Sequence, residues 1–345
     1  MKHLAKVKNK IGQYILVIFV TLTINFALPR LAPGDPLLYF FGETTINELT
    51  AEQKQEALHS LGLGGSLWEQ YWTYLKGVFT LDFGTSIKYG VAVTEVLTER
   101  IPWTLLLVGT ALILSLVIGV SAGAYSAWNR GKKRDLTILT GMLTLESIPG
   151  FWIGMMFLSI FAVQLGWFPT FGAVSMVQDG TTWGYIKDVV SHAILPVITI
   201  TLATVGSNYL LTRSSMLESL GQDYMTVAEA KGIKKRALVF KHALRNALLP
   251  IYTHFTLSVG TLLGGAVVIE TVYSYPGIGR LLYESVTARD FPMLQGVFLL
   301  VTMGVILANL IADLTYPLFD PRVRNREGRE GRGDHSCVKQ QSGLA

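Results

Sequence analysis

The chain alternates long apolar runs with shorter polar connections, and this pattern predicts six membrane-spanning helices. A span needs about 20 predominantly apolar residues, and each run is long enough to cross a bilayer with some tilt. The predicted spans are Ile11–Leu31, Pro102–Trp128, Leu136–Leu165, Ala193–Thr212, Ile251–Tyr273 and Met293–Leu318. The predicted fold class is therefore an all-α membrane protein with six transmembrane helices.

The first apolar run follows four lysines and looks at first like a secretory signal peptide. Its apolar part is longer than the roughly 7–15 residues of a signal core, and five more runs follow it. We therefore expect the first run to be retained as a membrane anchor.

Composition agrees with a membrane protein and excludes several site types. Half of the 345 residues are hydrophobic and only 15% are charged, against about 25% in soluble domains. The single cysteine, Cys337, rules out an intrachain disulfide. No glycine-rich phosphate loop is present, and neither His192 nor His242 has a second histidine at helical spacing. We expect no cofactor and no metal on this chain.

The distribution of lysine and arginine predicts the orientation in the membrane. The loop at 213–250 carries seven Lys/Arg against three acids up to Leu249, whereas the connection Gly166–Ser191 has only one lysine. The predicted organisation is a cytoplasmic N-terminus (1–10), a first span (11–31), an extracytoplasmic segment (32–101), a transmembrane core (102–318) and a cytoplasmic polar tail (319–345). The loop at 213–250 faces the cytoplasm in this arrangement.

One carboxylate, Glu146, lies deep within a predicted span. It follows Asp135 by 11 residues, about 16 Å along a helix and so near mid-bilayer. A charge there costs at least ~2.5–3.5 kcal/mol, so it calls for a reason. Ser147, Pro149 and Gly150 follow it, and proline and glycine are expected to kink the helix.

Two interpretations of Glu146 are open. It lines a transport pathway beside a helix break, or it is a protonated or hydrogen-bonded glutamate that locks two helices together. For Asp313, in the last span, we favour a structural cap or an interhelical hydrogen bond. The candidate pathway residues are Glu146, Ser147, Pro149 and Asn208.

Several short motifs occur in a fixed order along the chain. They are Leu31–Pro36, Asp82–Ser86, Ser147–Trp152, Leu165–Pro169, Thr212–Met216, Gln222–Tyr224, Ala230–Gly232, His242–Ala247, Gly264–Tyr273, Tyr275–Gly279, Ala288–Pro292 and Asp320–Arg322. In this order they resemble the permease subunits of bacterial ABC importers, in the dipeptide, oligopeptide and nickel branch. The resemblance runs from about Leu31 to Arg324.

The resemblance implies a type I importer permease fold and a transport subunit that is not an enzyme. It implies three kinds of partner besides membrane lipid: a second homologous permease, two cytoplasmic ATPase subunits that hold ATP and Mg, and an extracytoplasmic substrate-binding protein. No nucleic acid is expected. The location would be the bacterial inner or plasma membrane, with both termini cytoplasmic. Peptides are the favoured substrate, and oligosaccharides and nickel or metal chelates stay open.

The resemblance also implies that the cytoplasmic loop is the "EAA" coupling helix, which docks into a cleft on an ATPase subunit. Small residues at its centre permit close approach, and its cations suit an acidic rim. The expected coupling residues are Tyr224, Ala228, Glu229, Ala230, Gly232, Arg236, His242 and Arg245. The loop departs from the wider family pattern at Thr226, where a glutamate is usual. Glu146 is a second departure, since most relatives are expected to have a small or apolar residue there.

Three other classes fit the sequence less well. A secondary transporter without an ATPase should show repeated broken helices, and no internal repeat is visible. An intramembrane enzyme needs paired catalytic groups, but Glu146 and Asp313 lie at different depths. A purely structural or assembly protein does not need the long cytoplasmic loop.

Overall fold

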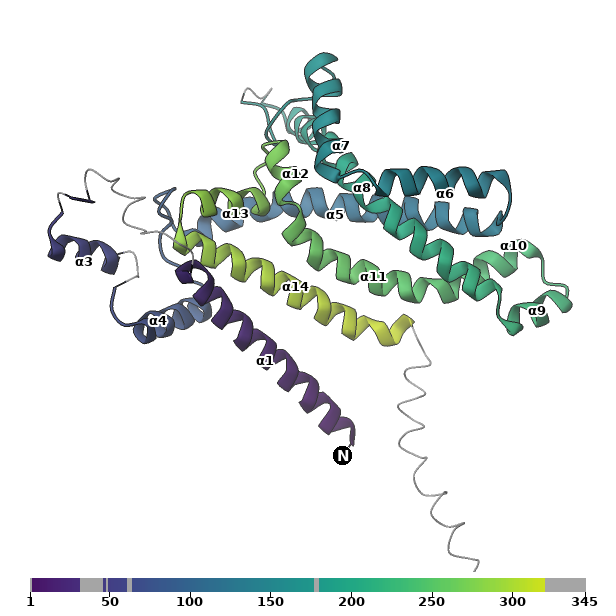
Figure 1. Cartoon of the computed structure of the whole chain (residues 1–345), viewed down its shortest axis with the longest axis horizontal. Helices are drawn as coiled ribbons and strands as arrows, with labels where there is room; N and C mark the ends of the chain where they lie inside the picture. Colours follow the sequence, from purple (N-terminus) through teal and green to yellow (C-terminus); the bar gives the residue numbers. More distant parts are fainter. Residues whose placement is uncertain (1, 32–45, 48, 61–63, 177–179, 320–345) are drawn as a thin grey trace, which may run out of the picture.

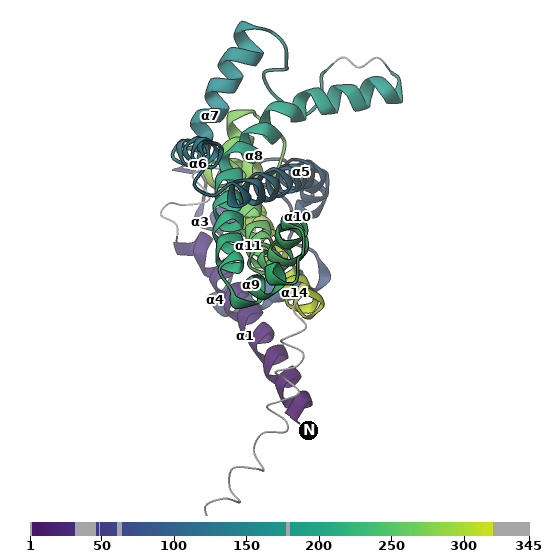
Figure 2. The same cartoon turned by 90° about the vertical axis from the view of Figure 1, so that its right-hand side faces the viewer.

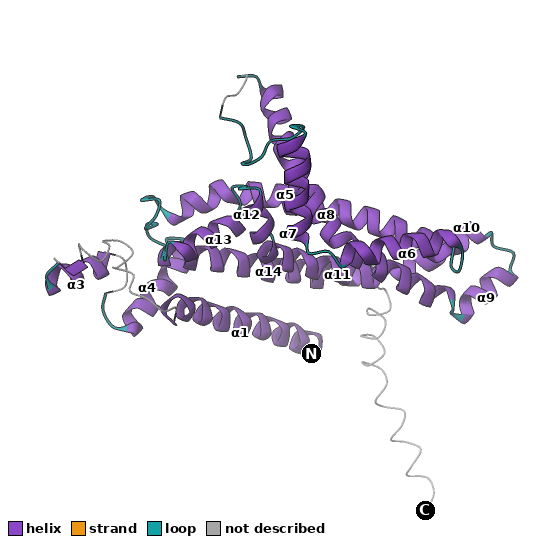
Figure 3. Ribbon diagram, turned by 45° about the horizontal axis from the view of Figure 1, so that its top comes forward, coloured by secondary structure: helices purple, strands orange, loops and turns teal. Residues whose placement is uncertain are grey.

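The computed structural model describes residues 2–31, 46–47, 49–60, 64–176 and 180–319. Within these ranges the regular elements are helices, and Thr85 and Ala92 form one isolated bridge. Helices α5, α8, α11 and α14 lie side by side in an elongated bundle (Figures 1 and 3). The predicted tail after Phe319, the segment 32–45 and the side chain of Asp313 lie outside the described residues.

In chain order the helices are α1 (Lys2–Leu31), α3 (Ala51–Ser60), α4 (Leu67–Thr80), α5 (Val93–Trp128), α6 (Lys133–Glu146), α7 (Gly150–Phe157), α8 (Thr182–Leu220), α9 (Asp223–Ala230), α10 (Lys235–Ala237), α11 (Leu244–Gly265), α12 (Val267–Val272), α13 (Ile278–Thr287) and α14 (Phe291–Phe319). Two π-helical segments, Leu158–Gln164 and Leu238–Ala243, follow α7 and α10. Figure 2 shows α7 and the first turns of α8 as two arms that leave the bundle.

Three helices of the described chain are long and apolar enough to cross a membrane: α5, α8 and the Phe291–Ile311 part of α14. The apolar part of α1, Gly12–Ala27, is shorter. The predicted span Ile251–Tyr273 is divided between α11 and α12. The all-helical class is confirmed, and the count of six spans stays a prediction.

The predicted span Leu136–Leu165 is not one straight helix. Helix α6 and the segment Gly150–Gln164 are long and apolar enough to cross a membrane only when taken together, and they are bent by 90° relative to each other. The bend falls between Glu146 and Gly150, where Pro149 precedes the first turn of α7. The kink predicted from the proline and glycine is therefore confirmed.

Small residues bring α5 and α8 into close contact. A Cβ on Gly119 would lie 2.6 Å from the Cβ of Asn208, and one on Gly123 would lie 2.7 Å from the Cβ of Thr212. Ser115, one turn earlier on α5, accepts a hydrogen bond from the Asn208 amide at 2.8 Å. Such a stripe of small residues is how membrane helices approach without a hydrophobic driving force. It fixes the position of α8, which carries Asn208 and leads into the loop at 213–250.

An ion pair ties α6 to α8 at the end of the bundle that carries α9. Asp135 is 4% exposed and accepts hydrogen bonds from Arg213 Nε at 2.8 Å and Arg213 NH2 at 2.9 Å. Ser126 Oγ on α5 donates to the same carboxylate at 2.5 Å, and Ser126 also contacts the hydroxyl of Tyr209 at 2.6 Å. Three helices therefore meet at one charged centre.

At the opposite end, a buried glutamate organises the turn between α12 and α13. Glu270 is fully buried and accepts hydrogen bonds from Thr104 Oγ1 at 2.8 Å and the Arg280 backbone N–H at 2.9 Å. A Cβ on Gly277 would lie 2.2 Å from the Glu270 carboxyl carbon. Glu270 thus satisfies the free N–H groups at the start of α13, which a helix N-terminus requires, and only glycine fits above it.

Candidate functional site

The cytoplasmic loop of the sequence prediction folds as a short helical hairpin. Helix α9 ends at Ala230, and Gly232 follows with a φ of 76°, a left-handed conformation that glycine adopts without strain. The Gly232 N–H donates to the Glu229 carbonyl at 2.9 Å and the Ile233 N–H to the Ala228 carbonyl at 3.3 Å. These bonds close the helix end and turn the chain back through α10.

An apolar face anchors the hairpin to the ends of α5 and α8. Its buried members share one cluster with residues of those helices, and the cluster comprises Ala124, Ala127, Met216, Met225, Leu238, Val239, Ala243, Ala247 and Ile251. Trp128, the last residue of α5, contacts the ring of Phe240 with the ring centroids 5.4 Å apart. The hairpin is therefore held rigidly on the bundle.

The opposite face of the hairpin is open. Of the eight residues predicted to couple to an ATPase, Tyr224, Glu229, Ala230, Gly232, Arg236 and Arg245 are exposed, and Ala228 and His242 are half-buried. The Asn246 amide donates to the Tyr224 hydroxyl at 2.6 Å and so joins α9 to the start of α11. The structure brings these residues together on one end of the molecule, and their coupling role stays a prediction.

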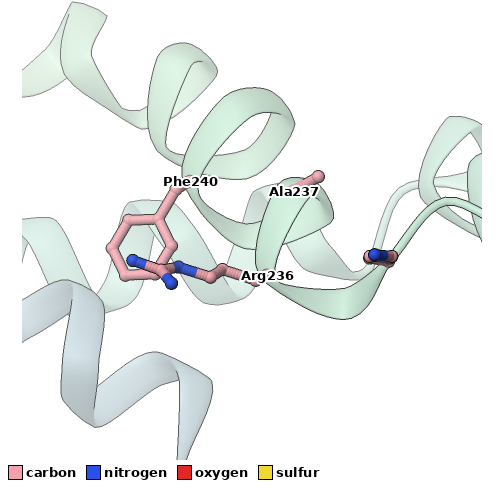
Figure 4. A pocket seen from close by; sticks show the side chains of 4 residues that line it. Arg236, Ala237 and Phe240 are labelled. Atoms are coloured by element: carbon pink, nitrogen blue, oxygen red, sulfur yellow. The ribbon is translucent and has the colours of Figure 1, made fainter.

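A hollow of about 480 Å³ lies beside the hairpin, lined by Lys234, Arg236, Ala237 and Phe240 (Figure 4). Its wall combines cationic side chains with an exposed aromatic ring, since Phe240 is 45% exposed. Phe240 was not among the residues predicted from the sequence. The available signal was an aromatic residue four positions after Arg236, on the same side of a helix.

Glu146 is the last residue of α6, and its carboxylate lies against α8. Ser207 Oγ donates to Glu146 Oε1 at 2.6 Å. A Cβ on Gly206 would lie 2.0 Å from Glu146 Oε2, so only glycine leaves room for the carboxylate at that position. Neither Gly206 nor the Ser207 contact was predicted, because the pairing joins residues 61 positions apart.

The other candidate pathway residues occupy different positions. Ser147 and Pro149 are exposed at the break after α6, and Ser147 Oγ donates to the Leu143 carbonyl at 2.8 Å. Asn208 is 4% exposed in the contact between α5 and α8, where its amide donates to Ser115. The structure thus groups Glu146, Ser147 and Pro149 but places Asn208 between two helices. The pathway role of all four stays a prediction.

The connection between α4 and α5 is fastened to the two helices after α12. Asp290 is fully buried, and it accepts hydrogen bonds from Ser86 Oγ at 2.5 Å and the Met293 N–H at 3.1 Å. Glu284 accepts from Lys88 Nζ at 2.9 Å, Tyr89 OH at 2.5 Å and Arg280 Nε at 2.8 Å.

Burial raises the pKa of the Glu284 carboxyl, but the hydrogen bonds from Lys88 and Tyr89 and the nearby positive charges outweigh it and lower the pKa to about 2. The hydrogen bond between Ser86 and Asp290 joins two sequence motifs that lie far apart in the chain, Asp82–Ser86 and Ala288–Pro292.

Two protein-family models cover most of the chain. The description "binding-protein-dependent transport system inner membrane component" matches residues 104–325, and the N-terminal part of the same system's membrane component matches residues 4–108. The chain belongs to this family. It is accordingly a multi-pass inner-membrane component of an ABC transporter, as the motifs predicted.

Curated relatives are similar in sequence to this chain over most of its length and most of their own. The di/tripeptide transport system permease protein DppB of Pseudomonas aeruginosa is 37% identical over 340 residues, which cover 94% of this chain and 99% of the relative. The dipeptide transport system permease protein DppB of Escherichia coli K12 is 38% identical, with coverages of 91% and 97%. The oligopeptide transport system permease protein AppB of Bacillus subtilis is 36% identical, with coverages of 87% and 93%.

The fold of this permease also resembles a solved structure. A chain of the inward-facing MetNI methionine ABC transporter superposes with a TM-score of 0.51 at 18% identity, covering 66% of this permease and 97% of that chain. At this identity the likeness concerns the fold alone. The predicted type I importer permease fold is confirmed in that sense.

Proposed function

We propose that this permease forms half of the translocation pathway of an ATP-driven importer for peptides delivered by a substrate-binding protein. The names of the relatives support peptides as the substrate class. The observation that carries the proposal is the hairpin α9–α10, whose apolar face is anchored on α5 and α8 while its small and cationic residues are open to a partner.

The hairpin has the physical properties that a coupling element needs. Its buried residues Met225, Leu238, Val239 and Ala243 share one apolar cluster with the bundle helices, so a push on its open face is transmitted rather than absorbed. Ala230 and Gly232 contribute no bulky side chain to its tip, and this allows a partner to approach the backbone closely there. Exposed Lys231, Lys234 and Arg236 add positive charge around the tip, which complements an acidic cleft.

The proposed complex contains this permease, a second homologous permease, two cytoplasmic ATPase subunits and an extracytoplasmic binding protein. ATP and Mg belong to the ATPase subunits. The lysine and arginine pattern supports an arrangement in which both termini and the hairpin are cytoplasmic and six segments cross the membrane. The connection before α5 and helix α13 then face the binding protein. Closure of the ATPases would rotate the permease halves as rigid bodies.

The test uses Ala230→Trp in the complete importer, reconstituted in vesicles with its binding protein. Ala230 is the exposed last residue of α9, so the indole is expected to block docking without disturbing the fold. Co-purification of the ATPase and ATP-dependent uptake of a labelled dipeptide should both fall at least about tenfold, which is about 1.4 kcal/mol.

Ser214→Trp, at an exposed position of α8 away from the hairpin tip, is the control and should keep both activities. Normal ATPase binding and uptake in Ala230→Trp would exclude the coupling role. Dipeptide uptake by the wild type that persists without ATP would instead favour a secondary transporter.

A further inference from the structure

Glu146 ends α6 at the break where the chain bends by 90°. It lies about 16 Å along the helix from Asp135, which places it near the middle of the bilayer in the proposed arrangement. The C-terminal end of a helix carries partial negative charge, so the helix dipole adds to the charge of the carboxylate. The carboxylate and the end of α6 both contribute negative potential here, and the start of α7 at Gly150 offsets part of it.

The carboxylate is held in one orientation from two sides. Ser207 Oγ donates to Oε1 at 2.6 Å, and Gly206 offers a bare backbone against which Oε2 lies. Because α8 packs closely against the Glu146 carboxylate, the direction of the remaining carboxylate lone pairs is fixed.

No cation within the described residues neutralises this group. The described Lys, Arg and His nitrogens form no ion pair with Glu146 within 4.0 Å, and the residue is exposed on the chain. An ionised carboxylate facing lipid costs at least ~2.5–3.5 kcal/mol. In its ionised form Glu146 therefore requires water or a positively charged group on this face of the chain.

We propose that Glu146 is a specificity-determining residue that binds the protonated α-amino group of the peptide in transit. This inference rests on the proposed function of peptide import. A peptide with a free amino terminus carries that positive charge near neutral pH, and a charge-assisted hydrogen bond to a fixed carboxylate is stronger than one between neutral groups. A bare divalent cation fits less well, since Ca²⁺ takes six to eight oxygen ligands and the described residues hold no cluster of three or more His, Cys, Asp or Glu side chains that would supply them.

The experiment compares uptake of two labelled dipeptides, one with a free and one with an N-acetylated amino terminus, by the complete importer in vesicles. The same binding protein serves every variant, so its own selection cancels when preferences are compared between permeases. Glu146→Gln keeps the size and a hydrogen-bond acceptor but removes the charge. We expect it to reduce the preference for the free amino terminus about tenfold, or about 1.4 kcal/mol.

Two matched variants accompany Glu146→Gln. Ser207→Ala frees the carboxylate but keeps its charge, so the preference should fall by a smaller factor. Thr144→Val changes an exposed polar residue of α6 two positions earlier, where it faces another side of the helix, and should leave the preference as in the wild type.

The outcomes separate this inference from the proposed function. Absence of any ATP-dependent peptide uptake by the wild type would refute the proposed function. Normal uptake with an unchanged preference in Glu146→Gln would overturn the inference alone. A third result, in which Glu146→Gln keeps the preference but weakens the association of the two permease subunits, would identify a cationic side chain of the second permease as the partner and would also overturn it.

Discussion

Asp135→Asn is the most informative stability test, because Asp135 joins three helices at one point. The carboxylate accepts hydrogen bonds from Arg213 Nε, Arg213 NH2, Ser126 Oγ and the Gly131 N–H at 2.5–3.1 Å. Removing one partner of a buried ion pair costs about 3–5 kcal/mol. The Arg213 side chain is 20% exposed, so water recovers part of its solvation, and we expect a loss of about 2–4 kcal/mol.

The assay is thermal unfolding of the purified chain in detergent. A loss of this size should lower the melting temperature by about 5–10 °C. Thr137→Val, at an exposed position of the same helix, should change stability by less than about 0.5 kcal/mol. The double variant Asp135→Leu with Arg213→Met removes both charges and should regain most of the loss. A melting temperature for Asp135→Asn equal to that of Thr137→Val, or no recovery in the double variant, would refute the reasoning.

Three further outcomes are expected. In a Cys337→Ser background, a cysteine placed at Gly221 should react with an impermeant thiol reagent only in inside-out vesicles; labelling from the outer side would reject the proposed orientation. Gly119→Ala should destabilise the chain by about 1–3 kcal/mol, since its Cβ would lie 2.6 Å from the Asn208 Cβ. The control Gly109→Ala should not, because a Cβ there has nothing within 4 Å. Equal melting temperatures of the two variants would contradict this reasoning. Because the folded-state pKa of Glu284 is lowered to about 2, its stabilisation is present above the ordinary pKa near 4.5 and lost as pH falls toward 2. The stability gap between wild type and Glu284→Gln, at most about 3 kcal/mol, should close over that range, and a gap constant from pH 7 to pH 3 would exclude the ion pair as its source.

The sequence predicted those features that depend on local chemistry. Pro149 has no N–H to continue the hydrogen-bond ladder of α6 and Gly150 has a low helix propensity, so the break was visible before the structure. The hairpin was visible as a polar, small-residue loop between apolar runs. Its turn at Gly232 follows from the left-handed conformation that glycine tolerates.

Features that depend on distant packing could not be predicted. Pro102 suggested the start of a span, but α5 begins nine residues earlier at Val93. Val93 and Leu97 are buried in a cluster with Ile278 and Met293, and this tertiary burial extends the helix past the proline. The pairing of Asp135 with Arg213 spans 78 positions, and nothing in the local pattern distinguishes these charges from others in polar connections.

Glu146 lies against α8, the helix that leads into the hairpin. This helix therefore connects the two parts of the candidate site. Helix α8 carries Gly206 and Ser207, which hold Glu146, and six residues later Arg213, which holds Asp135. Helix α6 is thus fastened to α8 at both of its ends. The hairpin follows α8 after only Gly221 and Gln222. Under the proposed function, a movement imposed on the hairpin therefore reaches Glu146 through the last turns of α8 and the polar contacts of Arg213 and Ser207 with α6.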